Sequence, residues 1–435
     1  MAVWALIFSL VSAGQVPVQG ELSSRALFRI KDQDSSRFSF FTTAGSLVFT
    51  PLANERLETK LGFTIRAQGF PLVNSATQLS AVDIVEPVSV LLDEAYVRFY
   101  DLVPGLSFTA GRQRVHWGSA DVINPTDNFT TPDYSDPLVW DRRRPVWMLH
   151  LGYSPLNALG MEFGLKPVFE PALNPPACWY DARVLPTVQE LRSALVAQLI
   201  GMGYDPVLAE QIAGQFDIRI REQLNLPGQT LNDFTWGGRV RTHLGRFDFS
   251  LSGLRGYDFL PEAQPVLTAD FAQQRLDFVL NEFFPQKTVF GADLATELAG
   301  IGLWAEAAYA LYDDTLLSDR LSVIGGMDYS FAGFYINLQY LHGDFPLARL
   351  QTEPVRDFLL AGLERRFASD RMLVRLGGVL DLEKRSFGLI PLVRVTPVSG
   401  LNLELTGLVF SGKTGSAFAP LDRVRELGFG ISYQF

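Results

Sequence analysis

The charged and aromatic residues between positions 94 and 145 are the group in this sequence best suited to chemistry. They include the segments 111–118 (GRQRVHWG), 121–127 (DVINPTD) and 140–145 (WDRRRP). Arginines and carboxylates that face each other across a water-filled passage create a transverse field, and such charges select which solutes pass. Arginines also bind carboxylate and phosphate groups through paired hydrogen bonds. The residue types therefore indicate recognition of polar or anionic solutes, unless the charges only brace a loop through ion pairs.

Catalysis and metal binding have much weaker support. Acyl transfer needs a nucleophile beside a paired histidine, and His116 with Ser119 or Asp121 is the only nearby grouping, without a recognisable signature. Cys178 is the only cysteine, and the four histidines show no ligand spacing, so we expect no cysteine-based metal site. The sequence has no glycine-rich phosphate loop and no nucleotide fingerprint. We therefore expect no enzyme, no metal and no cofactor.

Strands must hold these residues, because apolar and polar residues alternate along most of the chain. The last nine residues (LGFGISYQF) alternate strictly from Leu427 to Phe435. Successive side chains of a strand point to opposite faces, which gives one apolar and one polar face. The predicted strands lie near residues 22–31, 37–50, 56–69, 92–101, 106–115, 146–154, 159–168, 231–243, 246–257, 288–299, 301–312, 321–331, 334–345, 356–367, 370–381, 387–396, 401–411 and 425–435.

The connections between these segments alternate between short and long. Counted back from the C-terminus, every second connection is a short turn, from 396–400 back to 51–55. The long loops are 70–91, 116–145, 169–230 and 258–287. Bacterial transmembrane barrels have short periplasmic turns and long external loops. The sequence therefore predicts an all-β fold, an antiparallel up-and-down transmembrane β-barrel of about 18 strands, with roughly 16 to 20 as the range.

The composition agrees with a chain in which only every second residue meets lipid. Of the 435 residues, 47% are hydrophobic and 19% are charged, yet no run past the N-terminus approaches the roughly 18 apolar residues of a membrane helix. The net charge of −10 argues against nucleic acid as a partner, since that requires a basic face. A soluble sandwich or propeller is the alternative, but its strands are shorter.

The N-terminus and one loop depart from the barrel pattern. Residues 1–20 read as a signal peptide followed by the barrel at 21–435, although no basic residue precedes Arg25; a buried N-terminal strand is the alternative. Within the longest loop, an N-capping Asp205 and an apolar residue at every fourth position from Leu208 to Leu224 predict a helix, paired with an upstream one. We expect this helical hairpin at 186–226 either to cap the mouth, to enter the lumen, or to decorate the outside.

The cluster resembles a family of largely uncharacterised proteobacterial outer-membrane proteins with a porin-like domain. The resemblance covers about fifty residues and rests on an E-A-Y strand, a G-R-Q…W-G turn and an N-P-x-D loop. The matching residues are Glu94, Tyr96, Gly111, Arg112, Gln113, Trp117, Gly118, Asn124, Pro125 and Asp127. The last strand resembles that of Gram-negative outer-membrane barrels, whose terminal Phe is recognised by the barrel-assembly machinery. Tyr433 and Phe435 are therefore the expected assembly signal.

Alternation also predicts which wall residues face the interior. The inward candidates are Glu94, Arg98, Arg239, Arg241, Asp248, Asn337, Gln339 and Glu404. On the fifth strand Phe108 and Ala110 are expected to face lipid, so strict alternation sends Arg112 outward as well. A bulge at Gly111 would be needed to turn it inward.

We expect a porin-like channel in the outer membrane of the Gram-negative envelope for passive passage of small hydrophilic solutes, since side chains cannot fill an 18-stranded barrel. The alternatives are a surface-interaction or envelope-assembly barrel with a plugged lumen, and a substrate-specific transporter. Expected partners are the bilayer, lipopolysaccharide, the assembly machinery and small solutes, with a homo-oligomer left open. The candidates for the pore are Glu94, Arg98, Arg112, Arg114, Asp121, Asp127, Arg142, Arg143, Arg144, Arg239 and Arg241, with Trp117, Gly118, Asn124 and Pro125 shaping the loop turn.

Overall fold

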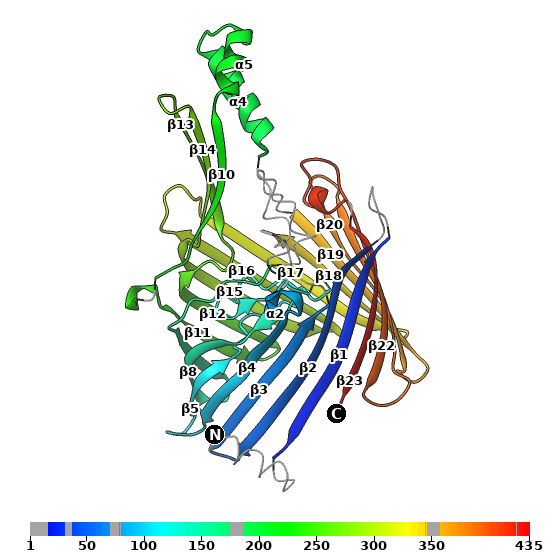
Figure 1. Ribbon diagram of the computed structural model, residues 1–435. Helices are drawn as coiled ribbons and strands as arrows, with labels where there is room; N and C mark the ends of the chain where they lie inside the picture. The colour runs from blue at the N-terminus through cyan, green and yellow to red at the C-terminus, as the bar shows by residue number, and fades with distance from the viewer. Residues whose placement is uncertain are drawn as a thin grey trace.

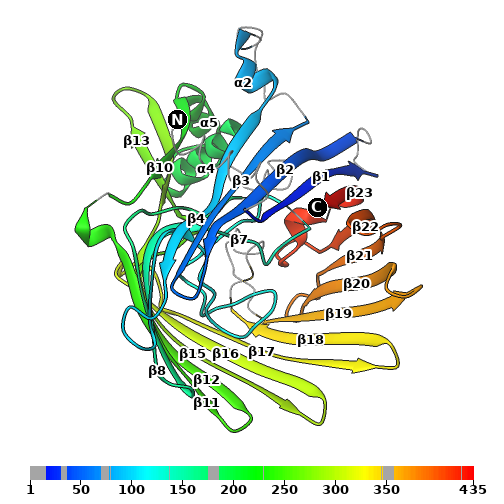
Figure 2. The same cartoon turned by 90° about the horizontal axis from the view of Figure 1, so that it is seen from below.

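The structure, a computed structural model, describes residues 16–30, 37–69, 78, 80–136, 138–174, 186–228, 230–343, 345, 357–422 and 424–435. Eighteen antiparallel strands form one sheet that closes into a barrel where β1 pairs with β23 (Figures 1 and 2). Most of the predicted signal peptide and Cys178 lie outside the described residues. The first strand begins at Val18, four residues before its predicted start, and the signal peptide stays a prediction.

All eighteen predicted segments are barrel strands, each within a few residues of its expected position, so the predicted fold is confirmed. The barrel strands are β1 (Val18–Arg29), β2 (Arg37–Ala53), β3 (Leu57–Gln68), β4 (Val88–Phe99), β5 (Leu106–Gln113), β8 (Val146–Leu156), β9 (Leu159–Lys166), β11 (Thr235–Leu244), β12 (Phe247–Tyr257), β15 (Gln286–Leu298), β16 (Ile301–Tyr312), β17 (Arg320–Phe331), β18 (Phe334–His342), β19 (Asp357–Phe367), β20 (Met372–Asp381), β21 (Phe387–Val395), β22 (Leu401–Ser411) and β23 (Arg425–Gln434).

Short turns join the strands at one end of the barrel, as the alternation of connection lengths predicted. Two of them place consecutive residues at positive φ, Ala299 with Gly300 and Ala332 with Gly333. Two residues at positive φ form the hairpin turn whose twist matches that of the flanking strands. We call this the short-turn end, and the opposite rim the long-loop end.

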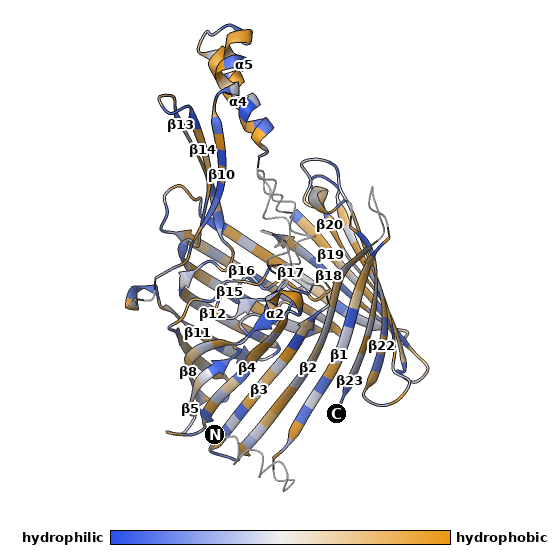
Figure 3. Ribbon diagram, in the orientation of Figure 1, coloured by the Kyte–Doolittle hydropathy of each residue, from blue (hydrophilic) through white to orange (hydrophobic). Residues whose placement is uncertain are grey.

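Hydrophobic and polar residues follow one another along the barrel strands (Figure 3), and many of the hydrophobic side chains are exposed on the outside. On β8 the exposed residues are Trp147, Leu149 and Leu151, which alternate with the buried Val146 and Met148. Exposed apolar side chains in alternation are costly in water and favourable in lipid. The outer surface is therefore that of a transmembrane barrel. Among the described residues, helices long and apolar enough to cross a membrane are absent.

The interior is packed unevenly. An apolar cluster fills the lumen beside β16–β23 near the long-loop end, and its centre is made of aromatic rings. The ring centroid of Phe345 lies 5.2 Å from that of Phe358 and 5.6 Å from that of Phe418. The cluster includes residues of the loop after β5, among them Ala120 and Trp140. The long-loop end of this side of the lumen is therefore apolar, whereas polar residues line the side formed by β1–β4.

A second folded unit stands beyond the long-loop end of the barrel (Figure 1). It combines α4 (Val188–Gly201) and α5 (Pro206–Gly214) with a three-stranded sheet of β10 (Asp217–Asn225), β14 (Arg275–Phe283) and β13 (Glu262–Asp270). We call it the projecting module. Leu191, Leu195 and Leu199 of α4 pack with Leu276 and Phe278 of β14 in a separate core. The module therefore has its own apolar interior outside the barrel.

The predicted helical hairpin is right for α4 and α5 but wrong in its last third. The second helix ends at Gly214, and residues 217–225 form β10 instead. A spacing of four residues fits both periods, because positions four apart share a face of a helix and also a face of a strand. Strands β13 and β14 were not predicted. The smaller elements are α2 (Val82–Val85), β6 (Thr131–Pro132), β7 (Arg143–Arg144), η2 (Leu231–Asp233) and η3 (Ala419–Leu421).

Candidate functional site

The loop between β5 and β8, residues 114–145, folds into the barrel, and we call it the inner loop. Its main anchor is Glu306 on β16, a carboxylate that is only 2% exposed. The backbone amides of Ser119 and Ala120 donate to Glu306 Oε1. Thr126 donates its hydroxyl to Glu306 Oε2 at 3.0 Å and its amide at 3.4 Å. A buried carboxylate needs such donors, so Glu306 and the loop fix each other.

The predicted turn residues shape this anchored segment. Gly118 has a φ of +93°, and a Cβ there would lie 2.3 Å from Thr126 Oγ1 and 2.4 Å from Glu306 Oε1. Only glycine fits so close an approach at that φ. Asn124 Oδ1 accepts from the amide of Asp127 at 3.1 Å, and Asn128 donates to the Pro125 carbonyl at 2.7 Å. The segment therefore forms a compact turn against the wall.

The inner loop also reaches other walls of the barrel. Asp121 accepts a hydrogen bond from Asn337 of β18 at 2.8 Å. Asp136 pairs with Arg25 of β1 at 2.5 Å. The ring centroid of Trp140 lies 5.4 Å from that of Phe345. Since β1 lies across the barrel from β16 and β18 (Figure 2), the inner loop crosses the lumen.

Each arginine of the inner loop has a carboxylate nearby. The pairs are Arg114 with Glu94 at 3.6 Å, Arg142 with Asp133 at 3.7 Å, Arg143 with Asp127 at 3.6 Å and Arg144 with Glu170 at 3.6 Å. Trp117 donates to Glu162 of β9 at 3.2 Å and packs edge-on against Phe129. These charges brace the loop, yet the side chains of Arg114 and Arg142 remain 43% and 37% exposed. Bracing and contact with solutes are therefore compatible roles for them.

Arg112 reaches the carboxylate of Glu170, although β5 has no bulge at Gly111. The register of β5 against β4 and β8 runs through Gly111 without a shift. Gly111 instead has a φ of +127°, and a Cβ there would lie 2.3 Å from the carbonyl of Ala95. The guanidinium of Arg112 donates to the Leu92 carbonyl at 2.8 Å and to Glu170 at 3.1 Å. The alternation continues past Gly111, since Arg112 lies opposite the exposed Trp147 and Gln113 lies opposite the buried Val146, so the long Arg112 side chain reaches Glu170 without a change of face in the strand.

The wall candidates form smaller networks. The pairs are Glu94 with Lys60 at 2.6 Å, Arg98 with Glu58 at 3.8 Å, Arg239 and Arg241 with Glu162 at 2.8 and 3.7 Å, Asn337 with Gln339 at 2.6 Å and Glu404 with Arg394 at 2.7 Å. Asp248 lies apart from these, at the short-turn end, where it contacts His243 at 2.7 Å. The predicted residues thus fall into one group around the inner loop and several pairs on the wall. Their role at a pore stays a prediction.

Three polar cavities lie beside the inner loop. The largest, of about 630 Å³, lies between β1, β2, β22 and β23 and the loop residues Ser135, Asp136 and Arg142. A second, of about 490 Å³, shares Glu21, Arg66 and Arg142 with it. A third, of about 460 Å³, shares Arg25, Arg394 and Glu404 with the first. Shared lining residues make the three cavities neighbours along the wall.

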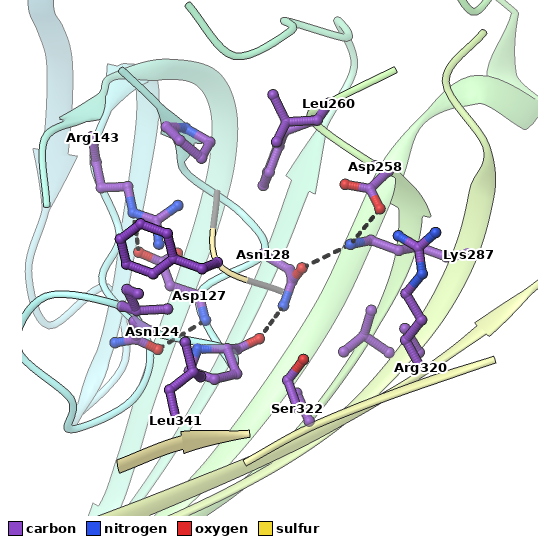
Figure 4. Close-up of a pocket in the computed structure, with 18 of the residues that line it drawn as sticks. Asn124, Asp127, Asn128, Arg143, Asp258, Leu260, Lys287, Arg320, Ser322 and Leu341 are labelled. Carbon is purple, nitrogen blue, oxygen red and sulfur yellow. Dashed lines mark hydrogen bonds and ion pairs between the residues drawn. The ribbon is translucent and has the colours of Figure 1, made fainter. Parts of the chain in front are cut away.

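A smaller cavity, of about 170 Å³, lies on the other side of the loop, against β15–β18 (Figure 4). There Lys287 donates to Asn128 at 3.1 Å and pairs with Asp258 at 3.5 Å. Leu341 and Trp140 line the apolar side of this cavity. Paired charges and apolar walls make it a packing space of the inner loop.

Two groups of the inner loop have shifted pKa values. The hydrogen bond to Asp127 raises the pKa of His116, whose Nδ1 lies 3.5 Å from that carboxylate. Burial raises the pKa of Asp121, which Asn337 partly offsets. Within the described residues, groups of three or more histidine, cysteine or acidic side chains that could hold a metal are absent.

Sequence reasoning missed several residues of this site, among them Arg25, Arg66, Arg394 and Glu306. Arg25 and Arg66 share the polar face of their strands with Ser23 and Thr64, so the alternation itself could have found them. Glu306 is the one carboxylate in the apolar run Leu303–Tyr312 (LWAEAAYALY), and that isolation was the signal. Arg394 lacks such a cue, because its neighbours do not set it apart.

No family model and no relative among curated proteins matches this sequence. Among solved structures, the chain is similar to a triple mutant of the Rh. blastica porin, with 10% identity and a TM-score of 0.43, over 97% of this chain and 100% of that one. It is similar to the same degree to OmpF of Salmonella typhi in complex with daunomycin, with 10% identity, a TM-score of 0.43 and 97% of each chain covered. Likeness of this degree carries no argument, and the fold rests on the strand pairing above.

Proposed function

We propose that this protein is a porin-like channel of a bacterial outer membrane, through which small hydrophilic solutes pass passively. One observation carries the proposal. The cavity of about 630 Å³ lies along the barrel wall past the inner loop. A lipid-facing barrel with polar space in its interior is the arrangement expected of a solute channel.

The lining of that cavity supports a through-path. Asn402 and Gln434 line it near the short-turn end, and Gln68 and Asn174 line it near the long-loop end. Between these ends Arg25, bound to Asp136 of the inner loop, lines the same space. The path therefore narrows where the inner loop meets β1, and we propose this point as the constriction.

Charge along the path supports a preference for anions. Eight arginines and six carboxylates line the two larger cavities, namely Arg25, Arg66, Arg112, Arg114, Arg142, Arg143, Arg144 and Arg394, with Glu21, Asp93, Glu94, Asp133, Asp136 and Glu404. The side chain of Arg66 has no ion-pair partner among the described residues. A local excess of positive charge in a chain of net charge −10 favours anionic over cationic solutes.

The remaining partners follow from the same proposal. The outer face would contact the bilayer and lipopolysaccharide, and the signal peptide would direct export through the periplasm. The barrel-assembly machinery would read Tyr433 and Phe435, whose rings stack at 6.1 Å on the last strand. Enzyme chemistry plays no part in this proposal.

Single-channel recording in planar bilayers tests the proposal. The purified protein should give discrete conductance steps. A variant in which a short Gly-Ser linker replaces residues 119–141 should give steps at least twofold larger, because the loop that narrows the lumen is gone. Replacing residues 188–214 in the same way is the matched control and should leave the step size unchanged. Silence of both the native protein and the loop deletion would contradict the proposal.

A plugged surface-interaction barrel is the second candidate, and the projecting module favours it. The module has its own core and stands clear of the barrel, as a partner-binding domain would. A substrate-specific transporter is a further variant of the channel, distinguished by saturation of the current with one solute. Larger steps in the loop deletion combined with none in the native protein would select the plugged barrel.

A further inference from the structure

The barrel wall is incomplete between β4 and β5. On that side β4 pairs only through its last five residues, Ala95–Phe99, with residues 108–112 of β5. Residues 88–92 of β4 pair with β3 on one side, and among the described strands none pairs with residues 88–94 on the other. The upper half of β4 is therefore an open edge in an otherwise continuous barrel.

A bulge marks the point where the pairing stops. The register of β3 against β4 shifts between Leu61 and Phe63, opposite Asp93 and Glu94. Asp93 accepts from Thr64 at 2.5 Å and Glu94 pairs with Lys60 at 2.6 Å, so both carboxylates face the lumen. Bulges terminate pairing and bend a strand. The bend of β4 at this bulge therefore coincides with the end of its pairing with β5.

The open edge lies at membrane depth. Val88 and Val90 on the outer face of this edge are 58% and 72% exposed, and Val90 pairs with the exposed Ile65 of β3. Apolar residues on the outer face mean that lipid reaches this level. Unpaired backbone groups facing lipid cost several kcal/mol each. Arg112 satisfies one of these backbone groups, because its Nε donates a hydrogen bond to the Leu92 carbonyl.

A cavity passes through the opening. The space of about 490 Å³ is lined by lumen residues, among them Ser46 and Thr64. It is also lined by Val90, Leu92 and Trp147, which belong to the lipid-facing side. A cavity bordered by residues of both faces lies in the gap of the wall itself. At the open edge of β4 the lumen and the outer surface are therefore separated by side chains and not by paired strands.

The opening has a charged inner side and an apolar outer side. Arg114, Arg143 and Arg144 of the inner loop line the cavity on its lumen side, and Arg112 lines it from β5. The Nε of Arg144 is buried and has no hydrogen-bond partner, whereas the side chain of Arg114 is 43% exposed and can contact a ligand in the cavity. Guanidinium groups suit an anionic head group, and Val90 with Trp147 suits an apolar tail.

We propose that this opening is a lateral portal through which an amphiphile with one anionic head and an apolar tail passes between the lumen and the surrounding lipid leaflet. The inference rests on the channel proposed above and adds a second exit to it. The head would move along the arginines while the tail leaves between β4 and β8. A purely hydrophilic solute would have no reason to take this route.

Thiol accessibility tests the portal in vesicles of phosphatidylcholine. In a chain with Cys178→Ser, the variant Val90→Cys should react at least tenfold faster with a water-soluble maleimide than Val97→Cys. Val97 is the matched control, because it is exposed on the same strand but lies where β4 and β5 pair completely. Dodecanoate should slow the reaction of Val90→Cys at least fivefold, and acetate should not.

Equal reaction rates for the two variants would overturn the portal, and so would a rate that dodecanoate does not change. Slowing of Val90→Cys by phosphatidylglycerol in the vesicles, without dodecanoate, would assign the opening to a bound membrane lipid and overturn the transport role. Protease resistance of the barrel first establishes that each variant is folded. Conductance of the native protein separates the failure of the portal from the failure of the channel. If the native protein conducts but the thiol of Val90→Cys does not react, only the portal is contradicted.

Discussion

The inner loop and the projecting module are both long insertions at the same end of the barrel, yet they are stabilised in opposite ways. The module forms two helices and a three-stranded sheet around leucines of its own. The inner loop forms only the two-residue strands β6 and β7, and its polar and aromatic groups bind to the wall. A segment without a local core becomes ordered only where another surface supplies partners. The barrel is therefore part of the folded state of the inner loop.

This difference has a functional consequence. The inner loop is held by contacts with the barrel wall, so the loss of one contact can change its conformation. The projecting module has its own core, so it can unfold without disturbing the lumen. We therefore expect substitutions in the inner loop to alter conduction, and substitutions in the module to leave it unchanged. The five predictions below test that separation.

The largest effect is expected for Trp140→Ala. Trp140 packs against Phe345 and Phe410 in the apolar cluster, and removing a packed aromatic side chain costs about 3 kcal/mol or more. The inner loop should leave the wall part of the time, giving larger and noisier conductance steps. Trp147→Ala, on the lipid-facing side of β8, is the control. An unchanged current trace for Trp140→Ala would show that packing against the barrel wall does not hold the inner loop in place.

Next in size is Leu195→Ala in the module. Leu195 is buried in the core between α4 and the sheet, and its truncation costs about 2–3 kcal/mol. The connection between α4 and α5 should become sensitive to protease while the conductance stays as in the native protein. A change in step size comparable to that of Trp140→Ala would show that the two regions are coupled.

Glu306→Gln should have an intermediate effect. The amide keeps the size of the side chain but turns a donor toward the amides of Ser119 and Ala120, which costs about 1–3 kcal/mol. Hydrogen exchange at those two amides should become at least fivefold faster. Glu297→Gln on neighbouring β15, where the side chain is exposed, should leave their exchange as it is. Equal protection in all three proteins would mean that the carboxylate does not hold the loop.

A smaller effect is expected for Arg142→Glu. Arg142 lines both larger cavities and its side chain is 37% exposed. Reversing this charge should shift the anion-to-cation permeability ratio toward cations about fivefold, or about 1 kcal/mol. The reversal potential in a KCl gradient measures the ratio. Lys384→Glu, in an exposed turn at the long-loop end, should leave the permeability ratio unchanged. An equal shift of the ratio in both variants would show that Arg142 does not set the ion selectivity.

The smallest effect is the pH dependence of the loop near His116. Because Asp127 raises the pKa of His116, the pairing stabilises the loop fully below the ordinary pKa near 6.5 and is lost as pH rises through the raised value. The half-exposed pair contributes about 0.5 kcal/mol. Current noise should therefore increase above neutral pH, and His116→Gln should remove this increase. A decrease on the alkaline side would reverse the assigned sign.

Much of the barrel was predictable because its rules are local. Alternation and turn length decide each strand independently, and the closing pair of β1 with β23 follows once the strands are counted. The helices α4 and α5 were also predictable, since Thr187 and Asp205 cap them within a few residues. The module as a unit was not, because β10 pairs in parallel with β14 across the intervening hairpin of β11 and β12. The sequence of β10 alone, or of β14 alone, does not indicate that the two strands pair.

The site was only partly predictable for the same reason. The residue types of the cluster at 94–145 were recognisable, but their partners come from distant strands. Glu306 lies 187 residues from Ser119 in sequence, and nothing near either residue indicates the other. The side on which the loop folds is decided by such contacts. Sequence alone therefore left open whether the inner loop or the helical hairpin occupies the lumen.

The pairing of the two chain ends sets the order of assembly. The amide of Gly20 donates to the carbonyl of Phe435 at 2.9 Å, and Glu21 pairs with Gln434. A contact of such separation is the slowest kind to form, because loop closure grows costlier with length. Until Phe435 arrives, β1 and β22 both expose strand edges that invite aggregation. Whatever holds the unfinished barrel in the envelope must therefore protect its first strand for as long as it takes to deliver the last.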